Sequence, residues 1–200
     1  MKEMKFEMPI ILTHYNYCPQ CGKPLQPTEF SGQLRPYCPD CSFVYWGNFS
    51  LGVGGVVWYE GKVLLVQRAN NPGKGTWTIP GGYVDQNEKI SEAVAREIKE
   101  ETGLIARPVS LLALRDRPGD KHDTYVVFLL EYQGGVLQAD PTEVSDIGFF
   151  TLEECQELPI AELSLSVIKA SRSTALKGFV PKAGIKIIGA QSVLYQSPED

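Results

Sequence analysis

Three glutamates stand at spacings that place their carboxylates on a single helical surface. Glu97, Glu100 and Glu101 occupy positions i, i+3 and i+4 in the stretch AREIKEETG, so on an α-helix they share one face. Like charges at this spacing repel one another, and the helix dipole disfavours anions in the last turn. A bound divalent cation removes the conflict, because hard cations such as Mg²⁺ prefer carboxylate oxygens. The pattern therefore predicts a cation-binding helix.

The loop before this helix supports the same prediction. It reads Trp77-Thr-Ile-Pro80-Gly81-Gly82 and joins a rigid proline to two glycines, which lets backbone groups approach a metal or a phosphate closely. The plainer alternative is an amphipathic helix that follows an ordinary glycine turn.

Four of the five cysteines form a second candidate metal site. Two Cys-x-x-Cys pairs are separated by sixteen residues, at Cys18, Cys21, Cys38 and Cys41. This spacing is typical of a four-thiolate zinc site, in which a closed tetrahedron leaves no open position for catalysis. The pairs therefore predict a structural zinc ribbon, and the alternative is four unrelated reduced thiols. Cys155 stands alone and is expected to be a buried or half-buried helix residue.

Charge argues against nucleic acid as the partner. The chain has a net charge of −5, whereas proteins that grip a phosphate backbone usually present a basic surface. Within residues 16–46, Lys23 and Arg35 only balance Glu29 and Asp40. We therefore expect an anionic small molecule as the partner and neither nucleic acid nor a membrane. The sequence also lacks a long apolar run and a signal-peptide pattern, which favours a cytoplasmic protein.

The apolar pattern predicts an α/β (α+β) fold with a mixed sheet covered by helices. Strands are expected at 56–59 and 62–68 around a Glu60-Gly61 turn, and at 109–115, 124–132 and 146–152. Helices are expected at 89–102, capped by Gly103, at 153–158 and at 162–177, with a further strand at 186–189. The predicted organisation is a leader over 1–15, a ribbon over 16–46, a catalytic domain over 47–177 and an extension over 178–200.

The stretch 82–104 resembles the Nudix box. It matches Gly-x5-Glu-x7-Arg-Glu-aliphatic-x-Glu-Glu-x-Gly-aliphatic at each specified position. Asp85 and Asn87 depart only from looser preferences, for Glu and Gly. The resemblance implies an α/β/α sandwich over about residues 50–175 and Mg²⁺- or Mn²⁺-dependent hydrolysis of a nucleoside diphosphate linked to another group, with a nucleoside monophosphate as one product.

The resemblance also implies roles for individual residues. The metal ligands are Glu97, Glu100 and Glu101, together with the carbonyl of Gly82. Arg96 and Glu88 position the catalytic helix. The general base is either a glutamate of the box or Glu143 on a later loop, for which a solvated loop charge is the alternative.

The substrate is less closely defined. A ribbon ahead of the box resembles two branches of the family, the NADH pyrophosphatases and enzymes acting on ADP-ribose or FAD. The chain lacks the Ser-Gln-Pro-Trp-Pro-Phe-Pro segment of the first branch, and its Pro118 resembles the proline of ADP-ribose hydrolases. Loop cations that can contact a phosphate or ribose are Arg115, Arg117 and Lys121. Aromatic platforms for an adenine ring are sought among Tyr45, Trp46, Trp77 and Tyr125.

Two alternatives remain open at this point. One is a ligand-sensing regulator on a Nudix scaffold that has lost catalysis, although the intact box argues against it. The other is a hydrolase of nucleoside triphosphates or capped RNA. A homodimer is an expectation from the resemblance alone, because the sequence carries no measure of assembly.

Overall fold

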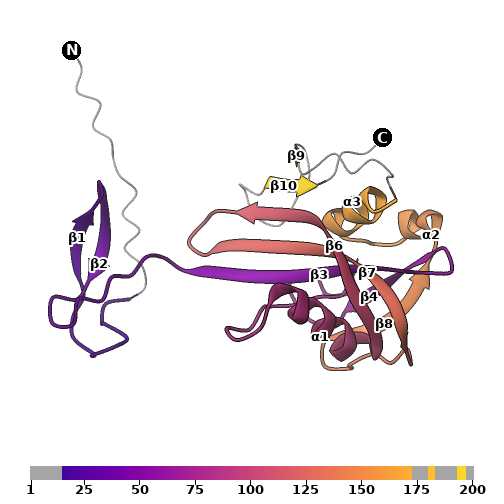
Figure 1. The fold of residues 1–200 in the computed structure, drawn as a ribbon, viewed down its shortest axis with the longest axis horizontal. Helices are drawn as coiled ribbons and strands as arrows, with labels where there is room; N and C mark the ends of the chain where they lie inside the picture. Colours follow the sequence, from indigo (N-terminus) through magenta and orange to yellow (C-terminus); the bar gives the residue numbers. More distant parts are fainter. Residues whose placement is uncertain (1–14, 173–179, 183–192, 197–200) are drawn as a thin grey trace, which may run out of the picture. The chain divides into compact units, whose positions relative to one another are not determined.

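The computed structural model describes residues 15–172, 180–182 and 193–196, which fall into two compact units. The first unit runs to Phe49 and includes Asp120–His122; the second begins at Ser50. Within the first unit, β1 (Gln26–Phe30) and β2 (Gln33–Tyr37) pair antiparallel around a turn at Ser31-Gly32 (Figure 1). The two cysteine pairs lie immediately before β1 and after β2.

The second unit is built on a mixed sheet. Its long strands are β3 (Phe49–Tyr59), β4 (Lys62–Arg68), β6 (Leu104–Arg117), β7 (His122–Gly135) and β8 (Val144–Phe150), and its short ones are β5 (Trp77–Thr78), β9 (Val180–Lys182) and β10 (Val193–Gln196). The strand order is β5-β4-β3-β7-β6-β10-β9, and β8 also pairs with β4.

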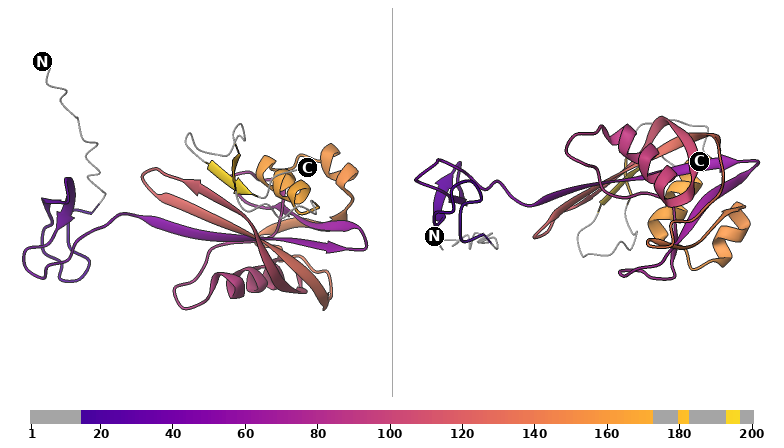
Figure 2. Two further views of the ribbon diagram at one scale, coloured as in Figure 1. Left: turned by 45° about the horizontal axis from the view of Figure 1, so that its top comes forward. Right: turned by 90° about the horizontal axis from the view of Figure 1, so that it is seen from below.

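Helices cover both faces of this sheet. Helix α1 (Ile90–Thr102) lies on one face, while α2 (Leu152–Glu157) and α3 (Glu162–Ala170) lie on the other (Figure 2). Alternation along β3 produces the two cores. Val53 and Val57 pack with Val94 and Ile98 of α1, whereas Val56 packs with residues of α3. The architecture is therefore an α+β sandwich with a mixed sheet, as the sequence predicts.

Local signals explain the ends of α1. The side chain of Glu92 accepts a hydrogen bond from the backbone N–H of Lys89 at 3.0 Å, which satisfies a donor before the first turn. At the other end Gly103 adopts a left-handed φ of 72°, and its N–H donates to the carbonyl of Lys99 at 2.9 Å. The predicted glycine cap is therefore confirmed.

Several predicted boundaries move. The hairpin around Glu60-Gly61 is confirmed, with Trp58 opposite Val63, but β6 and β7 extend well beyond the predicted 109–115 and 124–132. The sequence predicts a final helix over 162–177; α3 ends at Ala170, where the hydroxyl of Ser171 donates to the carbonyl of Ile168, and residues 173–177 lie outside the described residues. The predicted strand at 186–189 lies outside the described residues. Over the described ranges, every helix is too short or too polar to span a bilayer.

Candidate active site

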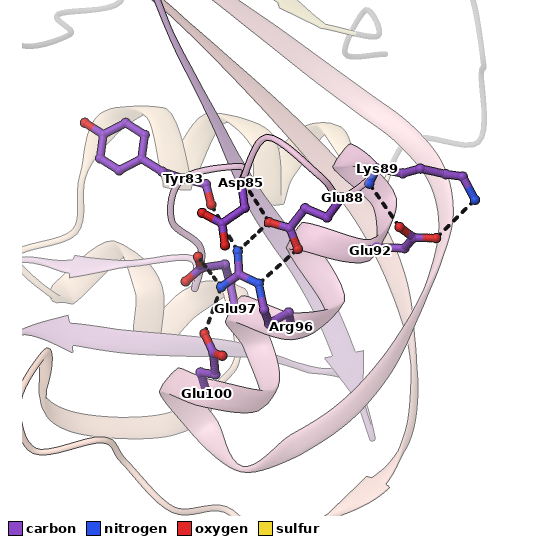
Figure 3. Close-up of polar contacts among 8 residues, drawn as sticks. All are labelled: Tyr83, Asp85, Glu88, Lys89, Glu92, Arg96, Glu97 and Glu100. Carbon is purple, nitrogen blue, oxygen red and sulfur yellow. Dashed lines mark hydrogen bonds and ion pairs between the residues drawn. The ribbon is translucent and has the colours of Figure 1, made fainter.

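Arg96 connects the glutamate helix to the loop that precedes it. Its guanidinium binds both oxygens of Glu88, at 2.6 and 3.0 Å, and donates to the carbonyl of Tyr83 at 3.1 Å (Figure 3). This pairing lowers the pKa of Glu88 to about 2, chiefly through the hydrogen bonds from Arg96. Arg96 and Glu88 therefore link the helix to the loop that precedes it.

The same guanidinium reaches two glutamates of the cluster. Its Nη1 donates to Glu97 at 2.9 Å and to Glu100 at 2.8 Å. Arg96 therefore relieves part of the repulsion among these glutamates, which the sequence alone predicts to be relieved by a bound cation. One guanidinium still faces three carboxylates, so the cluster remains short of positive charge.

Glu97 lies directly against the glycine loop. A Cβ added to Gly82 would stand 2.5 Å from the carboxylate carbon of Glu97, so only a glycine lets this carboxylate take its place. The carbonyl of Gly82 accepts a hydrogen bond from the N–H of Val53 at 2.8 Å and keeps its second lone pair. Burial raises the pKa of Glu97, and the neighbouring Glu100 and Glu143 add to this against the opposing pull of Arg96.

Glu101 is more deeply enclosed. Its side chain is buried, and one oxygen accepts a hydrogen bond from the N–H of Gly81 at 2.8 Å. Burial raises the pKa of Glu101 to about 8, and the charges of Glu97 and Glu143 act in the same direction. Glu97 and Glu101 are thus two buried carboxylates, of which the first raises the pKa of the second, and their oxygens are of the kind that hard divalent cations prefer.

Gly81 makes this arrangement possible and provides a test of it. Its φ is +153°, and an added Cβ would collide with the carbonyl oxygen of Val53 and stand 2.6 Å from the Cα of Gly54. Because backbone atoms cannot move aside, Gly81→Ala is expected to lower the free energy of unfolding by about 1–3 kcal/mol or more, measured by urea denaturation. Gly61→Ala is the matched control, since Gly61 also has a positive φ but no atom within 4 Å of an added Cβ. Equal losses for both variants would contradict the collision.

Glu143 stands beside the same cluster, on a loop fixed at both ends. The N–H of Ala69 donates to the Glu143 carbonyl at 2.9 Å, and the N–H of Asp140 donates to the carbonyl of Glu101 at 3.2 Å. These bonds tie the loop to the end of β4 and to the end of α1. The exposed Glu143 carboxylate is close enough to raise the pKa of both Glu97 and Glu101.

Of the three predicted substrate cations, Arg115 and Arg117 lie on strand β6, and Lys121 lies in the connection between β6 and β7. Arg115 and Arg117 both pair with the buried Asp123 of β7, which also accepts a hydrogen bond from Ser50 at 2.6 Å. Arg115 lies over the ring of Tyr125, 5.3 Å from its centroid. Burial raises the pKa of Tyr125, and Glu101 and Glu97 add to the effect. Tyr125 therefore stands between the arginine pair and the glutamate cluster.

The predicted aromatic platforms belong to different parts of the fold. Trp77 is only 6% exposed and packs in the core with its ring 4.8 Å from that of Phe150, so it has no face to offer a substrate and its predicted role is corrected. Tyr45 and Trp46 belong to the first unit, and Tyr125 is half-buried with a guanidinium on its ring. An exposed aromatic that the sequence reasoning missed is Tyr83, directly after Gly82 and 63% exposed.

The four paired cysteines converge in the first unit. Their sulfur atoms all lie within 4.8 Å of one another, with Cys18 and Cys41 at 3.4 Å and Cys21 and Cys38 also at 3.4 Å. The two turns share one backbone design. The N–H of Gly22 donates to the Cys18 carbonyl and that of Ser42 to the Cys38 carbonyl, both at 2.8 Å. This group can hold one metal ion. Cys155 is buried in the core, as predicted.

Comparison with known proteins agrees with this geometry. An ADP-ribose pyrophosphatase of Methanocaldococcus jannaschii is 41% identical over 112 residues, covering 54% of this chain and 66% of the relative. An NAD-capped RNA hydrolase NudC of Stutzerimonas stutzeri is 28% identical over 148 residues, covering 74% of this chain and 52% of the relative. The chain thus spans about half to two thirds of these curated relatives.

A crystal structure of a Nudix hydrolase from Nitrosomonas europaea has the same fold. It matches with a TM-score of 0.58 at 26% identity and covers 70% of this chain and 80% of that chain. The model of the NUDIX domain matches residues 49–170, which include the whole glutamate helix, the glycine loop and Glu143. Because this match spans well over half of the sequence, the chain belongs to the Nudix family.

Proposed function

We propose that this protein hydrolyses the diphosphate bond of a nucleoside diphosphate derivative, with ADP-ribose as the first candidate, and releases a nucleoside monophosphate. The observation that carries the proposal is the pair of buried carboxylates, Glu97 and Glu101, held against Gly81-Gly82 beside Glu143. The named relatives support the substrate class, since one is an ADP-ribose pyrophosphatase.

The cation expected at this site is Mg²⁺ or Mn²⁺, held by Glu97, Glu100, Glu101 and the carbonyl of Gly82. When bound, such an ion neutralises phosphate oxygens and lowers the pKa of a coordinated water. The protein's own contribution is placement. Arg96 holds the loop before α1 in place through Glu88 and the Tyr83 carbonyl. The N–H of Gly81 holds the carboxylate of Glu101. Arg115 and Arg117 supply positive charge for the part of the substrate that extends past Tyr125.

Glu143 is the proposed general base, and Glu143→Gln tests this role. Removing a base lowers kcat by roughly 10²–10⁴, whereas removing a solvated loop charge changes it little. Glu143 is exposed on a loop whose backbone bonds do not use its side chain, so the fold is expected to persist. Asp146→Asn, three residues further along the chain and also exposed, is the matched control. If both variants retain the parent kcat, a glutamate of the helix must act as the base instead.

One substrate panel separates the candidate functions. The protein is incubated with Mg²⁺ and ADP-ribose, FAD, NADH, dinucleoside polyphosphates, nucleoside triphosphates or NAD-capped RNA, and the products are identified. ADP-ribose is expected to give AMP and ribose 5-phosphate with the highest kcat/KM. The capped RNA belongs in the panel because of the NudC relative, and its preference over ADP-ribose would reverse our ranking. Binding of ADP-ribose without turnover of any compound would identify a regulator.

For the first unit we propose a structural zinc. Zinc–sulfur bonds of about 2.3 Å place the sulfurs of a tetrahedron about 3.8 Å apart, in keeping with the spacing of the four thiols. The four sulfurs would fill the coordination sphere of zinc and leave no open position for a substrate.

A further inference from the structure

Tyr125 reaches across the central strand of the sheet to the glycine loop. It stands on β7, which lies beside β3. The loop pairs along the other side of β3, where the N–H of Gly55 donates to the carbonyl of Pro80 at 2.9 Å. A Cβ added to Gly81 would stand 2.9 Å from the hydroxyl oxygen of Tyr125. The hydroxyl therefore ends beside the residue whose N–H binds the carboxylate of Glu101.

Two glycines of β3 make room for this side chain. A Cβ on Gly52 would stand 2.7 Å from a carbon of the Tyr125 ring, and a Cβ on Gly54 would collide with the hydroxyl oxygen. A glycine inside a strand weakens the strand and often marks a place where another group approaches closely. Here that group is the tyrosine, which packs on the face of the sheet that α2 and α3 cover. With Gly81, three positions that have no side chain surround Tyr125.

The hydroxyl is the part of Tyr125 that is left to meet a ligand. One side of the ring lies on the glycines of β3, and the guanidinium of Arg115 lies over the ring, 5.3 Å from its centroid. Within residues 15–172, 180–182 and 193–196, no hydrogen bond uses the hydroxyl. A hydroxyl that leaves bulk water without a partner costs free energy, so a ligand group that accepts from it would stabilise the complex.

The surroundings of the hydroxyl indicate the kind of group that would accept this hydrogen bond. Burial raises the pKa of Tyr125, the charges of Glu101 and Glu97 add to this shift, and Arg115 and Arg68 oppose it. The hydroxyl therefore keeps its proton and acts as a donor. Hydrogen bonds to a charged oxygen are stronger than those to a neutral one. A diphosphate held at the glutamates by a cation would bring charged oxygens to the loop where this hydroxyl ends.

We propose that the Tyr125 hydroxyl donates a hydrogen bond to an oxygen of the diphosphate of the substrate. This inference rests on the proposed function for the identity of the substrate. The sequence predicts Tyr125 as a platform for an adenine ring, and the proposal gives it a different contact, made by the hydroxyl and not by the ring.

The test removes the hydroxyl and keeps the ring. In the full chain, Tyr125→Phe retains the packing over the glycines of β3. Calorimetry with Mg²⁺ present gives the dissociation constant of the methylene-bridged analogue of ADP, whose P–C–P link resists hydrolysis. Tyr125→Phe is expected to weaken binding of this analogue by about tenfold to a hundredfold. Binding of Mn²⁺ alone, measured by electron paramagnetic resonance, is expected to stay unchanged, because the hydroxyl acts on the substrate and not on the cation site.

Tyr132→Phe is the matched control. Tyr132 lies on the same strand and is also half-buried, and its ring packs 4.5 Å from that of Tyr59, measured between centroids. Its loss of a hydroxyl is expected to leave both dissociation constants unchanged.

Four results would each overturn the proposal. They are an unaltered affinity of Tyr125→Phe for the analogue, the same loss in Tyr132→Phe, an equal loss of Mn²⁺ affinity in Tyr125→Phe, and a parent chain that does not bind the analogue at millimolar concentration. Because binding is read without turnover, the proposed function fails separately. Hydroxyl-dependent binding by a chain that hydrolyses nothing would refute the proposed hydrolysis and leave this role of Tyr125 standing.

Discussion

Glu101→Gln is expected to lower kcat by roughly 10²–10⁴, whether this carboxylate acts as a metal ligand or in proton transfer. The substitution keeps the size of the side chain and an oxygen that can still accept the hydrogen bond from Gly81. It removes the negative charge that a cation needs. The measurement is steady-state hydrolysis of the best substrate of the panel across a range of Mg²⁺ concentrations, and full activity in the variant would show that the site has been wrongly assigned.

The same variant is expected to gain stability when metal is removed. The pKa of Glu101 rises from 4.5 to about 8 on folding, so between these values the folded state holds a proton that the unfolded chain has lost. Stability from this group is therefore greatest at low pH and is lost as the pH rises toward about 8. In the presence of a metal chelator, the Tm of Glu101→Gln should exceed the Tm of the parent, and the difference should grow as the pH rises from 4.5 to about 8. A margin that shrinks with rising pH would contradict the burial argument.

Cys38→Ser is expected to abolish zinc binding and to unfold the first unit. Structural zinc sites in small ribbons contribute apparent binding free energies of about 10–16 kcal/mol, and this energy is also their folding energy. β1 and β2 form only a two-stranded hairpin, which is marginally stable by itself. The measurements are zinc content by elemental analysis, expected at one ion per parent chain, and limited proteolysis of residues 15–46.

Cys155→Ser provides the matched control for this experiment. Cys155 is buried in the core of the second unit, so its loss is expected to lower the Tm while zinc content and resistance of residues 15–46 to protease stay unchanged. Two results would contradict the idea that zinc holds the first unit folded. One is a Cys38→Ser protein that keeps its zinc, and the other is a parent chain whose proteolysis is unaltered by a chelator.

The sequence predicted the parts of the site that depend on spacing along one element. The helical periodicity placed Glu97, Glu100 and Glu101 on one face, and the Cys-x-x-Cys pairs gave the four-thiol cluster. The cysteine cluster is confirmed because a tight turn fixes where neighbouring side chains point. The shared metal-binding role of the glutamates stays a prediction, since Glu97 and Glu101 are buried and Glu100 is exposed. The ion pairs of Arg96 were less predictable. Its side chain is long, and different rotamers can bring the guanidinium to different carboxylates.

Features that depend on contacts between distant segments escaped the sequence. Trp77 was a candidate for stacking with a substrate base because it lies just before the two glycines. In the structure it packs against Phe150 and pairs with the segment at Ile160. Tyr83 looked like one aromatic among many. Its exposure follows from the bridge with Gly52, which turns Val84 toward the core and Tyr83 outward. Arg117 was predicted in a loop, just after a strand ending at Arg115, because the extension of β6 depends on pairing with β7.

The matching backbone bonds of the two cysteine turns have a consequence for protein engineering. Each turn closes on itself, through Gly22 in one and Ser42 in the other, so neither needs the intervening hairpin for its shape. The Ser31-Gly32 tip of that hairpin is therefore a position where an affinity tag or a fluorophore-binding peptide can be inserted. The cost of a longer connection grows only logarithmically with its length.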